Sequence, residues 1–390
     1  MQWIFDNLIF LFPLLIFTIL IGLHVVATQV SLKKKQLLII SLSSLLILHL
    51  DVFSYILLTS ISTLLLATIK KKVDLGKVIY PLTLLLIFIL LILKDYWVIF
   101  NVKNIYVPLG LSYYYFRLLS LLIEYSKRPK ELYKIDIWHY YTYIYFFPIF
   151  LAGPIHRFND FKMLKPTNYF KLYKWLLGAL LLKLLLVDMT LYYLVYKYLL
   201  VKVNTLTYID QSYIKTIGTV SLFGFTAFLH AYMDLMLYTE MSKSLSRILG
   251  FTVQENFNRP LLASNISKFW QSWHISLSNW TRDYIFFPTL LKTKKVWLST
   301  YASMLTIGLW HSATLNWIIW ALLHATALNF YGKLKEQTFF KNICMNQFGN
   351  AVLHVLGNII TIYFVSIVFI FIAIHDFKQA VSYIAMIFGL

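Results

Sequence analysis

Long apolar runs dominate this chain and limit what it can fold into. Stretches such as 8–30 and 351–374 carry no Asp, Glu, Lys or Arg, and a helix needs about 20 apolar residues to cross a bilayer. Of the 390 residues, 59% are hydrophobic and only 13% are charged, whereas soluble chains carry about 25% charged residues. The composition excludes a soluble enzyme, a disordered scaffold and a nucleic-acid-binding domain.

The spacing of these runs predicts an all-α, polytopic integral membrane protein with about ten to eleven transmembrane helices. After the first run at 8–30, the expected spans lie at 36–50, 54–69, 79–100, 107–125, 137–153, 173–200, 213–238, 300–330 and 351–374. We expect one membrane domain over residues 1–390, with further short re-entrant or interfacial helices.

Clustered cations between the runs indicate how the chain is oriented. The net charge is +19, and basic groups gather at 33–35, 70–77 and 127–134. Loops rich in Lys and Arg face the cytoplasm, so the charge indicates topology, with the N-terminus outside, and not a nucleic-acid partner. The single cysteine, Cys344, excludes internal disulfides and a multi-cysteine metal site, and we expect no bound metal.

A polar and aromatic segment at 242–295 interrupts the apolar pattern. A helix through 269–284 would place two groups of side chains on two different faces. The first group is Trp270, Trp273, Leu277, Trp280 and Tyr284, and the second is His274, Ser278 and Thr281. Because Trp and Tyr favour the membrane interface, the pattern predicts an amphipathic helix there.

Four polar residues lie together in the expected span 300–330: His311, Ser312, Thr314 and Asn316. Polar groups at membrane depth are costly unless they face the protein interior or a cavity. His311 could be a hydrogen-bond partner between helices, or it could act as a base, because imidazole titrates near neutral pH. Gly308, one turn earlier, leaves room for a group to approach.

Other charged residues allow structural or functional interpretations. Lys183 and Asp188 lie in an apolar run and could pair. His230 and Asp234, four residues apart, share a helical face. We interpret them as a hydrogen-bonded pair, although with His311 they could form the proton relay of a membrane transporter or flippase.

Five segments together resemble one known family. The strings ENFNRP at 255–260, FWQSWHISLSNWTRDY at 269–284 and GLWH at 308–311 are similar to the signature of the membrane-bound O-acyltransferase family. PLGLSYYYFR at 108–117 and FPIFLAGPIHRF at 147–158 resemble further segments in the same order. The likeness covers 105–330, which would be the family core between N-terminal helices at 1–104 and C-terminal helices at 331–390.

The resemblance implies a funnel or tunnel between a cytoplasmic acyl donor and an extracytoplasmic hydroxyl acceptor. His311 matches the family's catalytic histidine, and His274 matches a second motif histidine with a supporting role. Further tunnel candidates are Trp273, Ser278, Arg282, Asp283, Trp310, Asn316 and Arg157. The donor would be an acyl thioester, either acyl coenzyme A or an acyl carrier protein, and no cofactor would stay bound. The resemblance further implies a bacterial cytoplasmic membrane and an extracytoplasmic acyltransferase partner.

Two bacterial branches fit equally well: the one that D-alanylates teichoic acids and the one that O-acetylates alginate and similar polysaccharides. One departure is at 234–240, DLMLYTE, where Met236 and Leu237 replace a small Ser-Gly pair. This would narrow a passage there and favours a divergent substrate. A catalytically inactive family member that serves as a scaffold is a further alternative.

Overall fold

The computed structural model describes residues 32–50, 52–72, 111–127, 135–149, 153–162, 169–183, 185–187, 191–192, 197–204, 213–337 and 347–389. The expected spans at 8–30 and 79–100, and the residues Asp188 and Cys344, lie outside these ranges. All regular structure in the described ranges is helical, which agrees with the expected fold class. Contacts divide the chain into two compact units, 1–97 with 101–181 and 237–254, and 98–100 with 182–236 and 255–390.

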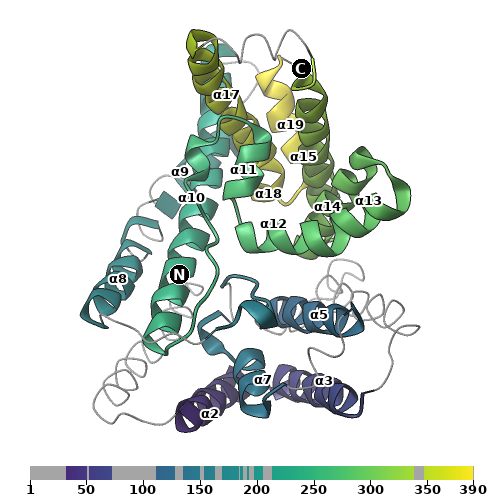
Figure 1. Cartoon of the computed structure of the whole chain (residues 1–390). Coiled ribbons are helices and arrows are strands. Elements are labelled where there is room, and N and C mark those ends of the chain that lie inside the picture. Colours follow the sequence, from purple (N-terminus) through teal and green to yellow (C-terminus); the bar gives the residue numbers. More distant parts are fainter. Residues whose placement is uncertain are drawn as a thin grey trace. The chain divides into compact units, whose positions relative to one another are not determined.

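The first unit contains the N-terminal helices (Figure 1). They are α2 (Leu32–Leu50), α3 (Val52–Lys70), α5 (Leu111–Lys127), α7 (Ile137–Ile144) and α8 (Tyr169–Leu182), with short 3-10 turns at Phe147–Ile149 and Phe158–Asp160. The Asp136 carboxylate begins α7 by accepting a hydrogen bond from the backbone N–H of His139 at 2.8 Å. The core is aromatic, and the rings of Phe161 and Phe251 stack at 4.7 Å.

The second unit contains most of the chain after residue 182. Its helices are α9 (Lys197–Asn204), α11 (Ile266–Ser272), α12 (Ile275–Thr281), α13 (Phe287–Thr293), α14 (Val296–His311), α15 (Leu315–Leu334), α17 (Gln347–Val368), α18 (Ile370–Ala373) and α19 (Phe377–Ile387), with a 3-10 turn at Pro260–Leu262 and a π-helical turn at Arg282–Phe286. The helix α10 (Tyr213–Ile248) contributes 213–236 to this unit and its remainder to the first.

Two described helical stretches are long and apolar enough to cross a membrane, Lys215–Ile248 and Ala351–Ala373. They correspond to the expected spans 213–238 and 351–374. The expected total of ten to eleven spans is not confirmed by the described residues.

The expected span at 300–330 forms two helices instead of one. The helices α14 and α15 are an antiparallel hairpin (Figure 1), joined by the short turn 312–314. Tyr301 and Thr326 share a hydrogen bond between their hydroxyls at 2.8 Å, which fixes the register near the open end. At the closed end, a Cβ on Gly308 would stand 2.7 Å from the carbonyl oxygen of Trp317. The group for which Gly308 leaves room is therefore α15.

The amphipathic helix expected over 269–284 is also broken. It divides at His274, whose φ of 41° lies in the left-handed region, where side chains other than glycine are strained. The backbone N–H of Ile275 donates to the carbonyl of Asn256 at 2.9 Å, and the Ser276 hydroxyl bonds the Asn256 side chain at 2.7 Å. Asn256 therefore holds the turn between α11 and α12 in this strained conformation.

Candidate active site

His311 is the last residue of α14, directly before the turn that leads into α15. The expectation that it lies in the middle of a continuous span is therefore wrong, because the polar residues Ser312 and Thr314 form a helix-to-helix turn. Backbone groups at helix ends lack intrahelical partners, which explains why polar side chains collect at this position. The turn leaves the His311 side chain partly accessible.

Tryptophan rings surround the imidazole of His311. Trp317 stacks on it with the ring centroids 4.2 Å apart and the planes 12° apart. Trp310 lies 4.3 Å away on the preceding position, and Trp320 presents a perpendicular ring at 6.4 Å. The stack on Trp317 of α15 therefore fixes the orientation of the His311 ring on α14. A side chain that acts as a general base must be held in such a fixed orientation.

His274 also contacts Trp310. The rings of His274 and Trp310 meet edge to face at 6.1 Å, so Trp310 contacts both motif histidines. His274 is only 3% exposed, and neither of its ring nitrogens has a hydrogen-bond partner among the described residues. Burial lowers the pKa of His274 to about 4, which keeps the ring neutral at physiological pH.

A third histidine belongs to the same aromatic cluster. His324 on α15 packs against Trp320 at 4.6 Å, and its Nδ1 accepts a hydrogen bond from Nε1 of Trp270 at 3.3 Å. The sequence suggests a packing or interface histidine at His324, although its position thirteen residues after His311 would also let it face the same cavity. Spacings of three and four residues place Trp317, Trp320 and His324 on one stripe of a helix, and this signal could have identified the cluster.

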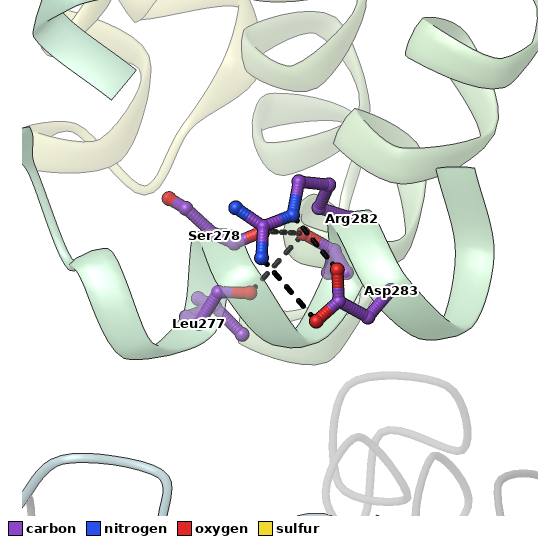
Figure 2. Close-up of polar contacts among 5 residues, drawn as sticks. Leu277, Ser278, Arg282 and Asp283 are labelled. Carbon is purple, nitrogen blue, oxygen red and sulfur yellow. Dashed lines mark hydrogen bonds and ion pairs between the residues drawn. The ribbon is translucent and has the colours of Figure 1, made fainter. Parts of the chain in front are cut away.

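The remaining candidates on α11 and α12 divide between core and surface. Trp273 is a core residue, stacked on Phe269 at 5.4 Å. The guanidinium of Arg282 forms an ion pair with Asp283 at 2.7 Å (Figure 2). Ser278 and Arg282 both line a large cavity. Arg282 therefore forms a local ion pair and also lines the cavity.

Asn316 has a structural role in the described fold. Its side-chain amide donates to the carbonyls of Phe371 at 2.8 Å and Ile374 at 2.6 Å, which caps the C-terminal end of α18. Arg157 belongs to the first unit, so its position near a tunnel stays a prediction.

The cavity at Ser278 and Arg282 has a volume of about 740 Å³ and lies within the second unit. Its lining carries cations at the start of α14 and the end of α15, together with one carboxylate. The charged lining residues are Arg282, Lys294, Lys295, Lys333, Lys335 and Glu336. Deeper along α14 the wall consists of Ser303, Met304 and Ile307. We call the charged lining residues the basic rim. On α14 the lining ends at Ile307, one turn before His311. Lys294 and Lys295 therefore lie at one end of α14 and the candidate base at the other.

Lys183 forms an ion pair with Asp234 on α10, whereas Asp188, the partner expected from the sequence, lies outside the described residues. The ammonium and the carboxylate form an ion pair in which the Lys183 side chain is 4% exposed and the Asp234 side chain 32%. His230, one turn before Asp234, packs against the ring of Tyr192 at 5.1 Å. The ion pair joins α10 to Lys183, which lies 51 residues before Asp234 in the sequence. The local spacing of His230 and Asp234 did not indicate this long-range contact.

Known proteins resemble this chain over most of its length. The model of the membrane-bound O-acyltransferase family matches residues 38–374. A probable alginate O-acetylase of Pseudomonas fluorescens is 30% identical over 237 residues, which are 58% of this chain and 45% of that protein. The teichoic acid D-alanyltransferase of Bacillus subtilis is 26% identical over 289 residues, 66% of each chain. A peptidoglycan O-acetyltransferase of Helicobacter pylori is 25% identical over 261 residues, 64% of this chain and 46% of that protein. This chain thus spans less than half the length of the alginate O-acetylase.

Proposed function

The chain belongs to the membrane-bound O-acyltransferase family, and from that premise we propose that it acylates a cell-surface glycopolymer. The acyl group would be of acetyl or D-alanyl type, in keeping with relatives named alginate O-acetylase, peptidoglycan O-acetyltransferase and teichoic acid D-alanyltransferase. The observation that carries the proposal is the pair of motif histidines joined through Trp310.

In the proposed reaction His311 is the general base. A hydroxyl of the acceptor gives its proton to the His311 imidazole as the hydroxyl oxygen attacks the thioester carbonyl carbon. The carbon–sulfur bond then breaks, the new ester stays on the acceptor, and the proton leaves with the thiol. Stacking on Trp317 supports this role, because it holds the ring in one orientation before the substrates meet.

His274 is proposed to stabilise the oxygen of the attacked carbonyl. A buried imidazole without a protein partner costs about 1–3 kcal/mol, and the left-handed backbone at the same residue adds strain. Such strain persists where the surrounding structure imposes it, often at a functional site. The neutral ring has one N–H, which can donate to the developing oxyanion.

The cytoplasmic donor would enter through the basic cavity. Its rim carries four lysines and Arg282 against one carboxylate, Glu336, and loops rich in Lys and Arg face the cytoplasm. Acyl coenzyme A and acyl carrier proteins both carry phosphate groups that this rim would attract. From Lys295 to His311 the rise along α14 is about 24 Å. A donor with a long flexible arm could therefore hold its phosphate at the rim and its thioester near His311.

We propose a bacterial cytoplasmic membrane as the location, because the named relatives come from bacteria. An extracytoplasmic acyltransferase partner would then supply the acceptor hydroxyl and pass the acyl group on to the glycopolymer. A proton-coupled transporter is a weaker hypothesis, because the carboxylate of Asp234 pairs with Lys183 and the ring of His230 packs against Tyr192.

The test is the set of ester-linked acyl groups that mild base releases from the envelope glycans. Cells would carry the intact chain, His311→Ala, His274→Ala, His375→Ala or no copy, at matched membrane expression. His375 is an exposed histidine outside the site, so its variant is the matched control. We expect His311→Ala to lower the rate of acylation about 10²- to 10⁴-fold and the control to match the intact chain. An ester profile that is the same in all five strains would refute acylation of the envelope as the function.

A further inference from the structure

A second cavity, of about 540 Å³, lies between α11, α15 and α17. Its walls come from the C-terminal half of α15 and from residues 353–364 of α17, and most of them are apolar. The apolar lining includes Phe330, Leu334, Leu353, Leu356, Ile360 and Phe364. Phe330 and Ile360 are each 66% exposed, so the cavity is open along its side. We call it the α15–α17 groove.

One end of the groove is polar and cationic. The ammonium of Lys268 donates to the Ser264 hydroxyl at 3.2 Å and lies 3.5 Å from Nε2 of His354. Within the described part of the chain, no carboxylate pairs with Lys268. Asn358 on α17 bonds the backbone carbonyl of Leu261 at 2.8 Å. The polar end is therefore fixed to α17, and its positive charge has no counterion there.

The length of the groove matches one leaflet of a bilayer. Its α17 wall belongs to the membrane-spanning stretch Ala351–Ala373, and His354 lies in the first turn of that stretch. From His354 to Phe364 the helix rises about 15 Å, which is half of the roughly 30 Å hydrocarbon core. The groove thus extends from the membrane interface to the middle of the bilayer.

The side of the membrane follows from the neighbouring charges. The groove begins beside Leu334, at the end of α15 that carries Lys333 and Lys335. Because basic helix ends face the cytoplasm, the polar end of the groove lies in the cytoplasmic leaflet. That leaflet presents anionic headgroups to basic side chains.

We propose that the α15–α17 groove binds one anionic glycerophospholipid of the cytoplasmic leaflet. The lipid phosphate meets Lys268, and one acyl chain lies along α17 from His354 to Phe364. A zwitterionic lipid brings its own cation close to Lys268 and binds more weakly. Inorganic phosphate meets Lys268 but gains nothing from the apolar wall. This site differs from the basic cavity near Arg282, with which it shares Tyr331 in its lining, and it does not depend on the proposed acyl transfer.

The experiment measures lipid binding to the purified full chain by native mass spectrometry in detergent. The probes are phosphatidylglycerol, phosphatidylcholine and inorganic phosphate. We expect one phosphatidylglycerol to bind, with Lys268→Gln weakening it about tenfold through loss of a charge-assisted hydrogen bond. Ile360→Trp fills the groove and weakens both lipids.

Two control variants separate the groove from the rest of the surface. Ile359→Trp adds the same bulk on the adjacent, 58% exposed position of α17, outside the groove lining. Lys378→Gln removes one exposed cation from α19. Both variants should bind phosphatidylglycerol as the intact chain does. If Ile360→Trp fails to fold, Leu356→Trp takes its place, because Leu356 lines the same wall.

Three results would overturn the proposal. Equal loss of lipid from Ile359→Trp and Ile360→Trp would show that binding does not use the groove. Equal affinity for phosphatidylcholine and phosphatidylglycerol in the intact chain would show that Lys268 does not select an anionic headgroup. If inorganic phosphate bound as tightly as phosphatidylglycerol, the apolar wall would contribute nothing, and the ligand of Lys268 would be a simple anion instead of a lipid.

Discussion

Substituting Gly308 tests the close packing of the hairpin that carries His311. In Gly308→Ala the new Cβ would stand 2.7 Å from the carbonyl oxygen of Trp317 and 2.8 Å from the Cβ of Ala321, whereas ordinary contact begins at 3.4 Å. The helices must therefore separate by about 0.7 Å (3.4 − 2.7) at this level. Overpacking of this kind costs about 1–3 kcal/mol.

The shift also moves His311 relative to its stacking partner Trp317. Displacements near 1 Å can lower catalytic rates about 10²-fold, so we expect a 10- to 100-fold slower transfer of acyl groups in Gly308→Ala. The midpoint of thermal unfolding in detergent should fall by several degrees. Adding Ala321→Gly removes one of the two clashes and should restore stability only in part.

The control for this prediction is Gly218→Ala on α10, where an added Cβ meets no atom within 4 Å. Alanine favours helix over glycine by about 1 kcal/mol, so this variant should unfold at the same temperature or higher and keep full activity. If Gly308→Ala behaves like Gly218→Ala in both measurements, the two helices are not as close as described and the reasoning fails.

Three further predictions concern stability, and each is measured as the midpoint of thermal unfolding in detergent. Lys183→Met should lose about 1–3 kcal/mol, because the partly buried Asp234 carboxylate keeps its charge without its cation, and Asp234→Leu added to it should restore most of the loss. Asn316→Asp should destabilise more than Asn316→Ala, because it sets a carboxylate against the α18 carbonyls that accept hydrogen bonds; equal effects would contradict the capping role. Burial lowers the pKa of His156 to about 4 from 6.5, so the unfolded chain binds more protons between these values and stability falls as the pH drops through that window. His156→Gln should reduce the loss of stability between pH 7 and pH 5, and an unchanged pH dependence would argue against the burial of His156.

The helical class follows from local pattern and is confirmed. The family strings select His274 and His311, whose rings both contact Trp310, and their roles stay a prediction. The sequence could not predict that the α14–α15 span folds back on itself. No Gly or Pro marks the turn at 312–314, and the polar residues there were interpreted as lining a cavity. Gly308 was interpreted as leaving room for a group to approach, but the sequence did not show that this group is the backbone of α15.

Long-range contacts were also beyond prediction from the sequence. Lys183 meets Asp234 across 51 residues, and nothing in either local sequence selects that pairing. The left-handed conformation of His274 depends on Asn256, which lies 18 residues earlier and holds the turn from outside. Local preferences favour a continuous helix there, so tertiary hydrogen bonds decide the break.

The α14–α15 hairpin also sets an order for the assembly of the site during synthesis. A three-residue turn costs little loop-closure entropy, and contacts that are local in sequence form early. The stack of His311 on Trp317 can therefore form as soon as both helices have left the ribosome. The carbonyls that Asn316 caps are made 55 to 58 residues later. The nascent chain thus forms the His311–Trp317 stack first, and Asn316 joins it to the C-terminal helices last.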